Sequence, residues 1–558
     1  MILSGADIIV KTLIEQGVET VFGYPGGQII HVYDSLYKYK KEINHVLTAH
    51  EQGAVHAADG FARASGKVGV VMATSGPGAT NLVTGIATAY LDSIPMVAIC
   101  GNVMTSQIGT DSFQEIDITG ITLPITKHNF FVSSVSELAE TIRLAFKIAL
   151  SGRPGPVLID VPKDVQIAKC EYTEQAKVEI EERKPAKDVR INEAVQLINA
   201  SKKPFIYFGG GLIASGAQEE MLSLAEKIDA PIGCSMMGLS GIPTDHPRFL
   251  GMQGMHGHYA SSVAMHNADL IISLGVRFND RVTGKREKFA KNAKIVHIDI
   301  DGSELSKTVD SSIGLRADIK LTLQKLLPLV LDSKKEEWQK AVEGFKKEEK
   351  ENEDMRDGLT PKNAIFALNK YLGENTPIAT DVGQHQMWTA QNACFKNPRR
   401  FISSGGLGTM GFGMGAAIGA SYATGEKTVL VTGDGSFGMC LNELATAVTY
   451  NVPLVILLFN NGVLGMVRQW QTLFFNKHYS NTVLQRKTDF VALSNAFGLK
   501  AERVDNLKDL DKALKNAFES KAPYLIDCKI DKDEFVLPML PPGGSMDDII
   551  VAKPLNNK

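Results

Sequence analysis

The chain has 558 residues, which at about 150 residues per domain predicts three or four domains. Its 59 Lys and Arg and 62 Asp and Glu give a net charge of -3 without a basic block, so we expect no nucleic-acid partner. No CxxC pair, no run of 18 apolar residues and no signal-peptide pattern occur in the sequence, which predicts a cytoplasmic globular protein without a membrane span.

The predicted elements alternate between helices and strands from the N-terminus onward. Ser4 caps a predicted helix that ends at Gly17, and residues 18–22 form a short strand that leads into the turn GYPGG. Ten further apolar runs follow, from VGVVMAT at 68–74 to YLIDCKI at 524–530, with helical patterns between them. This alternation predicts an α/β fold of doubly wound parallel sheets and excludes all-α and all-β folds.

Two charged stretches, at 178–190 and 334–358, divide the chain. Trp338, Val342 and Phe345 in the second are spaced i, i+4 and i+7, which predicts an amphipathic helix. We therefore expect three domains, at 1–175, 190–332 and 360–535, and a tail at 536–558. The prolines and glycines of PMLPPGGSMDD in the tail exclude regular structure, so the tail is either disordered or a lid over another part of the molecule.

Residues 70–100 and 429–459 share one layout: an apolar strand, a threonine, a glycine-rich turn, an alanine-rich helix, a proline and a second apolar strand. The layout predicts two related βαβ domains, each with a glycine-rich turn at the edge of the sheet where such folds bind ligands. Chance similarity between βα units is the alternative.

A carboxylate and an amide are expected to meet at one edge of the third sheet. Gly433, Asp434 and Gly435 end one predicted strand, and Asn460 and Asn461 end the next strand along the chain. Adjacent parallel strands bring these groups together beside a helix N-terminus that suits phosphate. Hard oxygen ligands beside phosphate predict Mg²⁺, although either half of the pattern alone is an ordinary turn sequence.

This pair is similar to the diphosphate-binding motif of thiamine diphosphate enzymes, GDG followed later by NN. The resemblance implies that Asp434, Asn461 and the main-chain oxygen of Val463 hold Mg²⁺, which in turn binds the diphosphate. Such enzymes also need a glutamate that drives the cofactor's aminopyrimidine to its imino form, and Glu51 in HEQGA is the candidate. The alternative is that Glu51 only complements the dipole of its helix.

A larger set of motifs resembles the catalytic subunits of acetohydroxyacid synthase (acetolactate synthase). The motifs are GYPGG, HEQGA, TSGPGATN, GTDSFQEIDI, RPGPVLIDVPKDV, GMHG, GVRFNDRVTG, GQHQMW, GGLGTMGFGMGAAIG, GDGSF and NNGVLGMVRQWQ. The resemblance implies a transferase that decarboxylates pyruvate on thiamine diphosphate. It condenses the hydroxyethyl group with a second pyruvate or with 2-ketobutyrate, giving 2-acetolactate or 2-aceto-2-hydroxybutyrate, the first common step of branched-chain amino acid biosynthesis.

The resemblance also implies roles for single residues. Met466 supports the bent form of the cofactor, and Gln114 and Lys163 lie near the cofactor and the substrate entrance. Arg277 binds the carboxylate of the acceptor ketoacid while Trp470 packs on the extra methyl of 2-ketobutyrate. The implied catalytic residues are Glu51, Gln114, Lys163, Arg277, Met466 and Trp470.

Two organic cofactors are implied. The thiamine diphosphate residues are Tyr24, Pro25, Gly26, Gly27, Glu51, Pro77, Asn81, Gln384, His385, Gly408, Met410, Gly433, Asp434, Gly435, Ser436, Asn461, Val463, Leu464, Gly465 and Met466. The FAD residues are Arg153, Gly209, Gly210, Gly211, Ser235, Met236, Met255, His256, Gly275, Arg277, Asn279, Arg281, Val282, Asp299, Ile300, Ala317 and Asp318.

The flavin site has the weaker motif. FIYFGGGLIASG is a strand, three glycines and a helix, but Ala214 stands where the dinucleotide fingerprint has its last glycine. Asp299 in HIDID fits a ribose as well as a metal. Asn279 stands where the family commonly has aspartate, which puts one polar contact with the flavin in doubt.

Three other functions remain open: a catabolic acetolactate synthase without FAD, an oxidoreductase similar to pyruvate oxidase, and a noncatalytic binding protein. RFNDRVTG, GMHG and RQWQ favour the anabolic synthase. Because Glu51 and Asp434 lie in different domains, the resemblance implies active sites between two chains. It also implies a homodimer or homotetramer and a separate small regulatory subunit.

Overall fold

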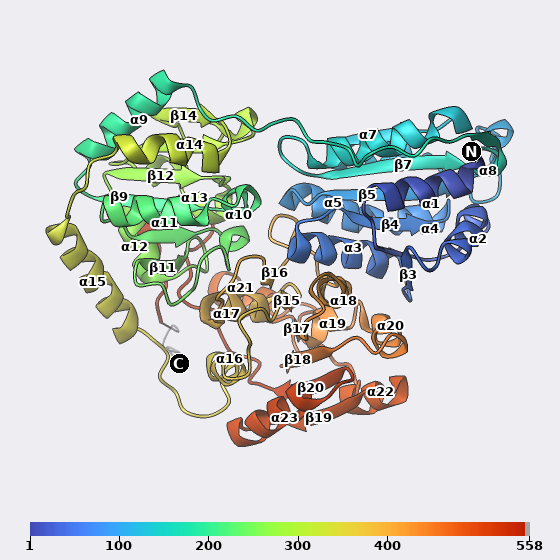
Figure 1. Cartoon of the computed structure of the whole chain (residues 1–558). Coiled ribbons are helices and arrows are strands. Elements are labelled where there is room, and N and C mark those ends of the chain that lie inside the picture. Colours follow the sequence, from blue (N-terminus) through green and yellow to red (C-terminus); the bar gives the residue numbers. More distant parts are fainter. Residues whose placement is uncertain (553–558) are drawn as a thin grey trace.

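The structure is a computed structural model that describes residues 1–552. It contains three α/β domains: the N-terminal domain and the middle domain lie side by side, and the C-terminal domain lies below both in the view of Figure 1. Each domain surrounds a six-stranded sheet in which every strand pair is parallel. The predicted fold class is therefore confirmed.

The N-terminal and C-terminal sheets have one topology. Their strand orders are β3-β2-β4-β5-β7-β6 and β16-β15-β17-β18-β20-β19, and both are 2-1-3-4-6-5 when each sheet is numbered from its own first strand. The repeat predicted from the sequence is thus a pair of domains with the same arrangement. The strands are β2 (Thr20–Gly23), β3 (Asn44–Leu47), β4 (Gly69–Ala73), β5 (Met96–Asn102), β6 (His128–Phe131) and β7 (Pro156–Pro162), and then β15 (Ile378–Thr380), β16 (Phe401–Ile402), β17 (Thr428–Gly433), β18 (Leu454–Asn460), β19 (Lys500–Val504) and β20 (Tyr524–Lys529).

The middle sheet has the order β11-β10-β9-β12-β13-β14, or 3-2-1-4-5-6, which is the order of dinucleotide-binding domains. Its strands are β9 (Pro204–Phe208), β10 (Ile232–Cys234), β11 (Phe249–Met252), β12 (Leu270–Leu274), β13 (Lys294–Asp299) and β14 (Ile313–Arg316). A separate antiparallel pair, β1 (Ile2–Ser4) and β8 (Lys169–Glu171), joins the two ends of the N-terminal domain.

Helices cover both faces of each sheet, as apolar runs on every strand require. Helix α1 (Gly5–Glu15) begins as predicted, with Ser4 Oγ accepting a hydrogen bond from Asp7 N. The other helices of the N-terminal domain are α2 (Ile30–Lys38), α3 (Glu51–Ser65), α4 (Pro77–Thr80), α5 (Val83–Asp92), α6 (Ile118–Thr122), α7 (Leu138–Leu150) and α8 (Lys163–Ile167).

The later helices follow the same pattern. The middle domain has α9 (Asp188–Ala200), α10 (Gly210–Ser215), α11 (Gln218–Lys227), α12 (Tyr259–Asn267), α13 (Asp280–Thr283) and α14 (Ile319–Leu326). The C-terminal domain has α16 (Pro361–Asn369), α17 (Gln384–Asn392), α18 (Gly413–Thr424), α19 (Asp434–Phe437), α20 (Leu444–Thr449), α21 (Gly465–Phe474), α22 (Phe490–Phe497) and α23 (Leu507–Glu519). Within residues 1–552 no helix is long and apolar enough to cross a membrane.

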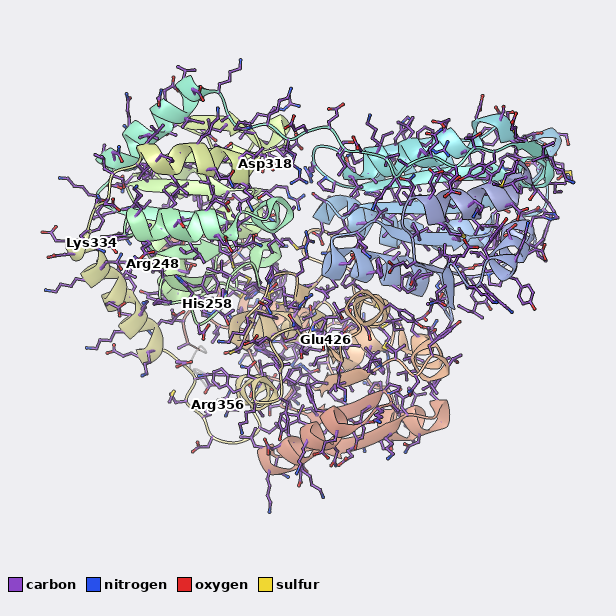
Figure 2. The ribbon with its side chains drawn as sticks, in the orientation of Figure 1. Arg248, His258, Asp318, Lys334, Arg356 and Glu426 are labelled. Atoms are coloured by element: carbon purple, nitrogen blue, oxygen red, sulfur yellow. The ribbon has the colours of Figure 1, made fainter. Side chains whose placement is uncertain are left out.

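The second charged stretch contains α15 (Glu336–Glu351), the predicted amphipathic helix. Trp338 and Val342 are buried in the core of the middle domain, and Trp338 Nε1 donates a hydrogen bond to Pro204 O at 3.0 Å. The helix therefore packs along the middle domain instead of crossing solvent. In the linker that follows lies Arg356, which is labelled in Figure 2. It forms ion pairs with Asp354 and Glu534.

The tail after β20 returns to the middle domain. Leu540 N donates to Met255 O at 2.8 Å, and Lys285 N donates to Gly544 O at 2.8 Å. Met539 and Ile550 pair with each other, which folds the tail into a hairpin-like loop against the middle domain. Of the predicted lid tail at 536–558, residues 553–558 lie outside the described residues.

The N-terminal and C-terminal domains are joined by a close crossing of α3 and α18. A Cβ atom at Gly60 would overlap Ala416 O, and one at Gly419 would overlap Ala57 O. Glycine at these positions lets the two helix backbones touch, which no larger residue permits. The crossing is continuous with one apolar core that contains side chains of both domains.

We predict that Gly419→Ala destabilises the protein, since the added methyl has no space and overpacking costs about 1–3 kcal/mol or more. Gly344→Ala is the matched control, because Gly344 lies on the exposed side of α15 with open space where the alanine methyl would lie. There the higher helix propensity of alanine adds up to about 1 kcal/mol. Thermal melts of both variants test this, and equal melting temperatures would contradict it.

Candidate active site

Many of the predicted site residues lie where each sheet reverses its strand order. These residues follow β2 and β4 in the N-terminal domain, β9 and β12 in the middle domain, and β15 and β17 in the C-terminal domain. Others follow neighbouring strands, as Glu51 follows β3 and Asn461 follows β18. At such a switch point the two crossover helices leave on opposite faces, and a crevice opens at the carboxyl ends of the strands. The sequence motifs therefore correspond to three crevices, one in each domain.

In the C-terminal crevice, Asp434 and Asn461 follow adjacent strands, since β17 and β18 pair in parallel with Gly433 opposite Phe459. Asp434 Oδ2 accepts a hydrogen bond from Gly462 N at 2.9 Å, and Asn461 Oδ1 accepts one from Val463 N at 3.1 Å. Burial raises the pKa of Asp434 to about 6. The two side chains and the turn that they order thus lie at one edge, as predicted.

The neighbouring asparagine has a different environment. Asn460 Nδ2 donates to Asp527 Oδ1 on β20 at 2.8 Å, and both residues are buried. Asn460 therefore joins strands within the sheet, which leaves Asn461 as the asparagine of the crevice.

The crevice residues fit a diphosphate and a hard metal ion. Gln384 Oε1 and His385 Nε2 are buried there with no hydrogen-bond partner within the described chain. Burial lowers the pKa of His385 to about 3, so the ring is neutral and able to donate from one nitrogen. One carboxylate, one amide oxygen and a turn carbonyl form a donor set that suits Mg²⁺ when phosphate oxygens complete it.

Three glycines allow the turns around this crevice to pack closely. A Cβ atom at Gly433 would lie 2.8 Å from His385 Nδ1, one at Gly435 would lie 2.7 Å from Leu464 Cδ2, and one at Gly465 would overlap Gln384 Oε1. The GDG turn, the His385 turn and the start of α21 are therefore packed too tightly for side chains at these positions.

In the N-terminal crevice, Glu51 begins α3 and accepts a hydrogen bond from Asn81 Nδ2 at 2.9 Å. Asn81 directly follows the short helix α4 of the TSGPGATN turn, so this turn orients the Glu51 carboxylate. Gln114 packs on the same turn, because a Cβ atom at Gly76 would lie 2.9 Å from Gln114 Cβ. Gly27 has open space around it, and nothing within the described residues contacts a Cβ atom there.

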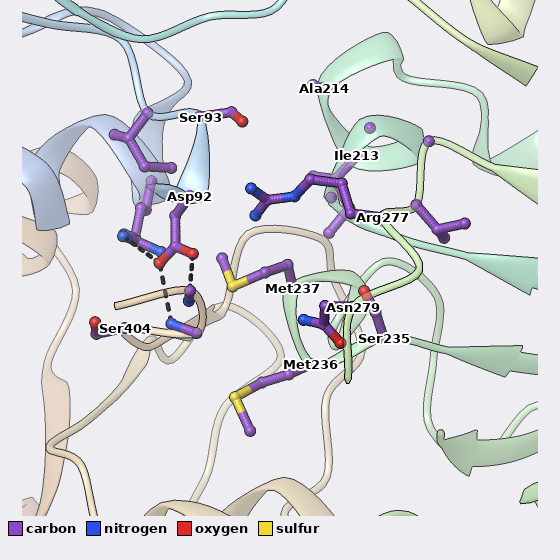
Figure 3. Close-up of a pocket in the computed structure, with 18 of the residues that line it drawn as sticks. Asp92, Ser93, Ile213, Ala214, Ser235, Met236, Met237, Arg277, Asn279 and Ser404 are labelled. Atoms are coloured by element: carbon purple, nitrogen blue, oxygen red, sulfur yellow. Dashed lines mark hydrogen bonds and ion pairs between the residues drawn. The ribbon is translucent and has the colours of Figure 1, made fainter. Parts of the chain in front are cut away.

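A cavity of about 640 Å³ lies where all three domains meet (Figure 3). Asp92 and Ser93 line it from the N-terminal domain, Arg277 and Met237 from the middle domain, and Ser404 from the C-terminal domain. All the predicted flavin residues except Gly209 line this cavity. They are joined there by Gly408, Met410, Met466 and Trp470 of the predicted thiamine and catalytic sets.

The middle-domain wall has the form of a dinucleotide site. A Cβ atom at Gly209 would overlap Gly275 O, and one at Gly211 would lie 2.6 Å from Gly275 Cα, so these glycines bring the β9 and β12 turns together. Gly210 is less crowded, its nearest neighbour being Met237 O at 3.4 Å. The 640 Å³ volume and this turn fit a flavin dinucleotide.

Polar groups line the same wall. Asp318, which is labelled in Figure 2, caps α14 by accepting a hydrogen bond from Leu321 N. Its Oδ2 lies 3.4 Å from Nη1 of Arg183. Burial raises the pKa of Asp299 to about 6, and burial with the charge of Arg281 lowers the pKa of His256 to about 4. His256 Nδ1 is buried with no partner in residues 1–552, which leaves it free for a ligand.

Arg277 and Trp470 both line the cavity, but the guanidinium that lies over the indole belongs to Arg281. Arg277 lies three residues after the end of β12 and extends toward Asp92 and Ser93 of the N-terminal domain (Figure 3). Arg281, in the first turn of α13, lies over the Trp470 ring with its guanidinium carbon 5.8 Å from the ring centre. The α13 turn therefore aims the second arginine of GVRFNDRVTG, not the first, at α21.

The predicted site residues form two groups that lie apart within one chain. Helix α21 begins beside the C-terminal crevice and also lines the cavity with Met466 and Trp470, which lie one turn apart. The pyrimidine-side residues are on the N-terminal domain, and none of them lines the cavity of the same chain. This group consists of Tyr24, Pro25, Gly26, Gly27, Glu51, Pro77, Asn81, Gln114 and Lys163.

Several cavity residues were not predicted from the sequence. Arg183 comes from the linker after the N-terminal domain and donates to Ala214 O, and Asp92 ends α5. Residues 404–406 come from the loop between β16 and α18. Each lies in an element that contacts another domain, so its place in the cavity depends on domain packing. The only sequence signal is a carboxylate at a helix end and glycines in a loop.

Comparisons with known proteins agree with this architecture. Residues 3–121 match the model of the thiamine pyrophosphate enzyme N-terminal TPP binding domain, residues 191–326 match that of the central domain, and residues 381–528 match that of the C-terminal TPP binding domain.

Relatives extend over nearly the whole chain. The chain is 47% identical to a probable acetolactate synthase large subunit of Methanocaldococcus jannaschii, with 98% of this chain and 95% of the relative covered. It is 42% identical to the acetolactate synthase isozyme 3 large subunit of Escherichia coli, with 99% of both chains covered. The chain belongs to the acetolactate synthase large-subunit family. It is also 44% identical to the isozyme 2 large subunit of Escherichia coli over 98% of its length.

One buried carboxyl of this family member lies near the predicted Lys163. Asp160 on β7 accepts a hydrogen bond from Asn102 Nδ2 at 2.7 Å, and its other oxygen is buried with no partner in the described chain. Burial, the dominant cause, raises the pKa of Asp160 to about 7, and the charge of Asp117 adds to the effect. The folded protein thus holds a proton that the unfolded chain releases near pH 4.

We predict that Asp160→Asn stabilises the protein relative to the natural chain as pH rises. Because the folded pKa is raised, the stability contributed by the protonated form is lost between about pH 4 and pH 7, and asparagine cannot ionise. From pH 5 to pH 8 the relative gain is roughly 3 kcal/mol.

Thermal melts of both proteins at pH 5 and pH 8 test this prediction. Asp245→Asn is the control, because Asp245 is exposed and its pKa is lowered by Lys396. A constant difference in melting temperature between the natural chain and Asp160→Asn over this pH range would show that Asp160 is not protonated in the folded state.

Proposed function

We propose that this chain is a catalytic subunit of acetohydroxyacid synthase. It condenses the two-carbon unit left from pyruvate with a second pyruvate or with 2-ketobutyrate, in branched-chain amino acid biosynthesis. The observation that carries the proposal is that Asp434 and Asn461 lie at one sheet edge in a molecule whose three domains enclose a cavity. The chain is also 42–47% identical to acetolactate synthase large subunits over nearly its full length.

Thiamine diphosphate and Mg²⁺ are the proposed cofactors of the C-terminal crevice. Asp434, Asn461 and the Val463 carbonyl would hold the metal, and His385 and the free amides at α19 would contact the diphosphate. When bound, thiamine diphosphate supplies a nucleophilic carbon and an electron sink for decarboxylation of a ketoacid. Met466 would support it from α21.

Glu51 is the proposed proton-transfer residue. Its carboxylate would exchange a proton with the pyrimidine ring nitrogen of the cofactor, and the hydrogen bond from Asn81 would hold it in that orientation. If Glu51 only complemented the dipole of α3, its carboxylate would not need the hydrogen bond from Asn81 that fixes its orientation.

FAD is the proposed ligand of the cavity wall formed by the middle domain. The strand order of that domain, the close Gly209–Gly275 turns and the partnerless Nδ1 of His256 support a dinucleotide. The Arg277 side chain has no hydrogen bond or ion pair within the described residues and faces the cavity, so we assign it to the anionic part of the dinucleotide.

Arg281 takes over the acceptor role expected of Arg277. Its position over Trp470 supports a guanidinium that binds the acceptor carboxylate beside an indole wall for the extra methyl of 2-ketobutyrate. Trp470 is held in turn by Phe474, whose ring centre is 6.0 Å away.

A homodimer or homotetramer is the proposed assembly, with each site between two chains. The placement of Glu51, Asn81 and Gln114 away from the cavity of their own chain supports this, because a second chain would have to supply them. Lys163 and Gly27 belong to the same group. The relatives are named large subunits, which supports a small regulatory partner. The unpaired cysteines support a cytoplasmic location.

The proposed function is tested on the purified chain by acetolactate formation from pyruvate, with and without thiamine diphosphate and Mg²⁺, and by the absorbance of bound flavin. We expect yellow protein and cofactor-dependent acetolactate. We also expect Glu51→Gln to lower kcat by about 10²–10⁴, because proton transfer is lost. Glu19→Gln, at an exposed surface pair with Lys67, is the control with unchanged kcat.

The other outcomes separate the rival functions. Colourless protein that forms acetolactate would indicate the catabolic synthase, and oxygen uptake without acetolactate would indicate a pyruvate oxidase activity. A Glu51→Gln variant with full activity would exclude the proton-transfer role.

We predict that Trp470→Leu lowers the preference for 2-ketobutyrate over pyruvate as acceptor by about 10-fold or more, since one methyl in an apolar site is worth about 1–3 kcal/mol. The product ratio in competition between the two acceptors measures it. Phe475→Leu is the control, because Phe475 is exposed at the C-terminal end of α21 and lies outside the cavity lining. Equal product ratios for the two variants would refute the role of Trp470.

A further inference from the structure

The loop at 403–411 joins β16 to α18 and forms one wall of the cavity; we refer to it as the 403–411 loop. Ser404, Gly405, Gly406, Gly408 and Met410 all line the cavity. A loop of this composition has little packing of its own, since four of its nine residues are glycines. Its position must therefore be fixed by contacts with other elements.

Asp92, the last residue of α5 in the N-terminal domain, makes the first of these contacts. Its Oδ1 accepts a hydrogen bond from Gly406 N at 2.7 Å, and its Oδ2 accepts one from Gly405 N at 3.0 Å (Figure 3). A Cβ atom at Gly406 would lie 2.9 Å from Asp92 Oδ1, so glycine is required for this approach. One carboxylate thus holds two consecutive amides of the loop.

Thr88 makes the second contact from the same helix. Its Oγ1 lies 2.7 Å from Thr409 Oγ1, and both side chains are buried. Thr88 and Asp92 are four residues apart and share one face of α5. The helix therefore holds the loop on both sides of Gly408.

Arg63 of α3 fixes the Asp92 carboxylate. Its Nη2 donates to Asp92 Oδ2 at 2.9 Å, and its Nη1 donates to Ser403 O at 2.8 Å. It also pairs with Asp59 one turn earlier in α3. All four residues are buried, and removing one member of a buried ion pair leaves an uncompensated charge.

We propose that Asp92, assisted by Thr88, is a positioning residue that sets the 403–411 loop in the cofactor cavity. The N-terminal domain would then control the cofactor contacts of Gly408 and Met410 in the C-terminal domain of the same chain. The proposal rests on the proposed function of these two residues in the cofactor site. A purely structural role predicts lower stability alone, whereas a positioning role predicts changed cofactor affinity and turnover in a folded protein.

The test compares Asp92→Asn with Asp229→Asn in the full-length protein. Asparagine keeps one oxygen but presents an NH₂ group to the second glycine amide and to Arg63. Asp229 is the matched control, because it also joins a guanidinium (Arg248, 2.8 Å) to a backbone amide (Lys335, 2.9 Å), outside the cavity.

For Asp92→Asn we expect at least a 10-fold lower kcat at saturating pyruvate and at least a 5-fold higher half-saturation concentration of thiamine diphosphate, with retained secondary structure by circular dichroism. Asp229→Asn should lower the melting temperature without changing either kinetic value. Asp92→Asn with a lower melting temperature and unchanged kinetics would overturn the proposal.

A second pair of variants, at Thr88, tests the proposal if Asp92→Asn does not fold. Thr88→Val removes the hydroxyl contact with Thr409 and should raise the half-saturation concentration of thiamine diphosphate about 3-fold, while Thr88→Ser keeps the contact and should match the natural chain. Equal values for the two would overturn the proposal. Failure of the proposed function is distinguishable, because the natural chain itself would then form no acetolactate.

Discussion

The direct contact between the backbones of α3 and α18 determines how the rest of the molecule is arranged. Glycines at the crossing bring the two helices so close that the N-terminal and C-terminal domains share one apolar core. The same crossing turns α5 toward the 403–411 loop and brings Arg63 of α3 beside Ser403. Glu51, at the start of α3, does not line the cavity of its own chain. A local steric requirement thus helps to set which of the predicted site residues one chain brings together.

The sequence predicted those parts of the site that depend on local chain geometry. Asp434 and Asn461 follow adjacent strands, so their spacing along one crossover was enough to bring them to the same edge. The shared layout of residues 70–100 and 429–459 likewise predicted two domains of one topology. Trp338 and Val342 indicated a helix from spacing alone, because a buried stripe requires that periodicity.

The parts that were missed depend on how domains pack. Asp92 is, in the sequence, an ordinary carboxylate at a helix end, and only the docking of the C-terminal domain supplies the two amides whose hydrogen bonds it accepts. Arg277 and Arg281 are four residues apart in one motif. Their side chains point in different directions because Arg281 lies in α13 and Arg277 lies before it. The roles of the individual cofactor residues remain predictions for the same reason: ligand contacts across crevices depend on spatial arrangement that sequence spacing does not define.

The tail braces one wall of the cavity from outside the three sheets. Gln469, next to Trp470, exchanges two hydrogen bonds with the backbone of Val536, and Leu540 pairs with Met255 beside Arg281. Residues 536–540 lie after the last strand of the three sheets, so the wall that holds Trp470 and Arg281 is braced by a segment that belongs to none of the sheets. The position of this wall can therefore change with the tail while the three sheets stay intact.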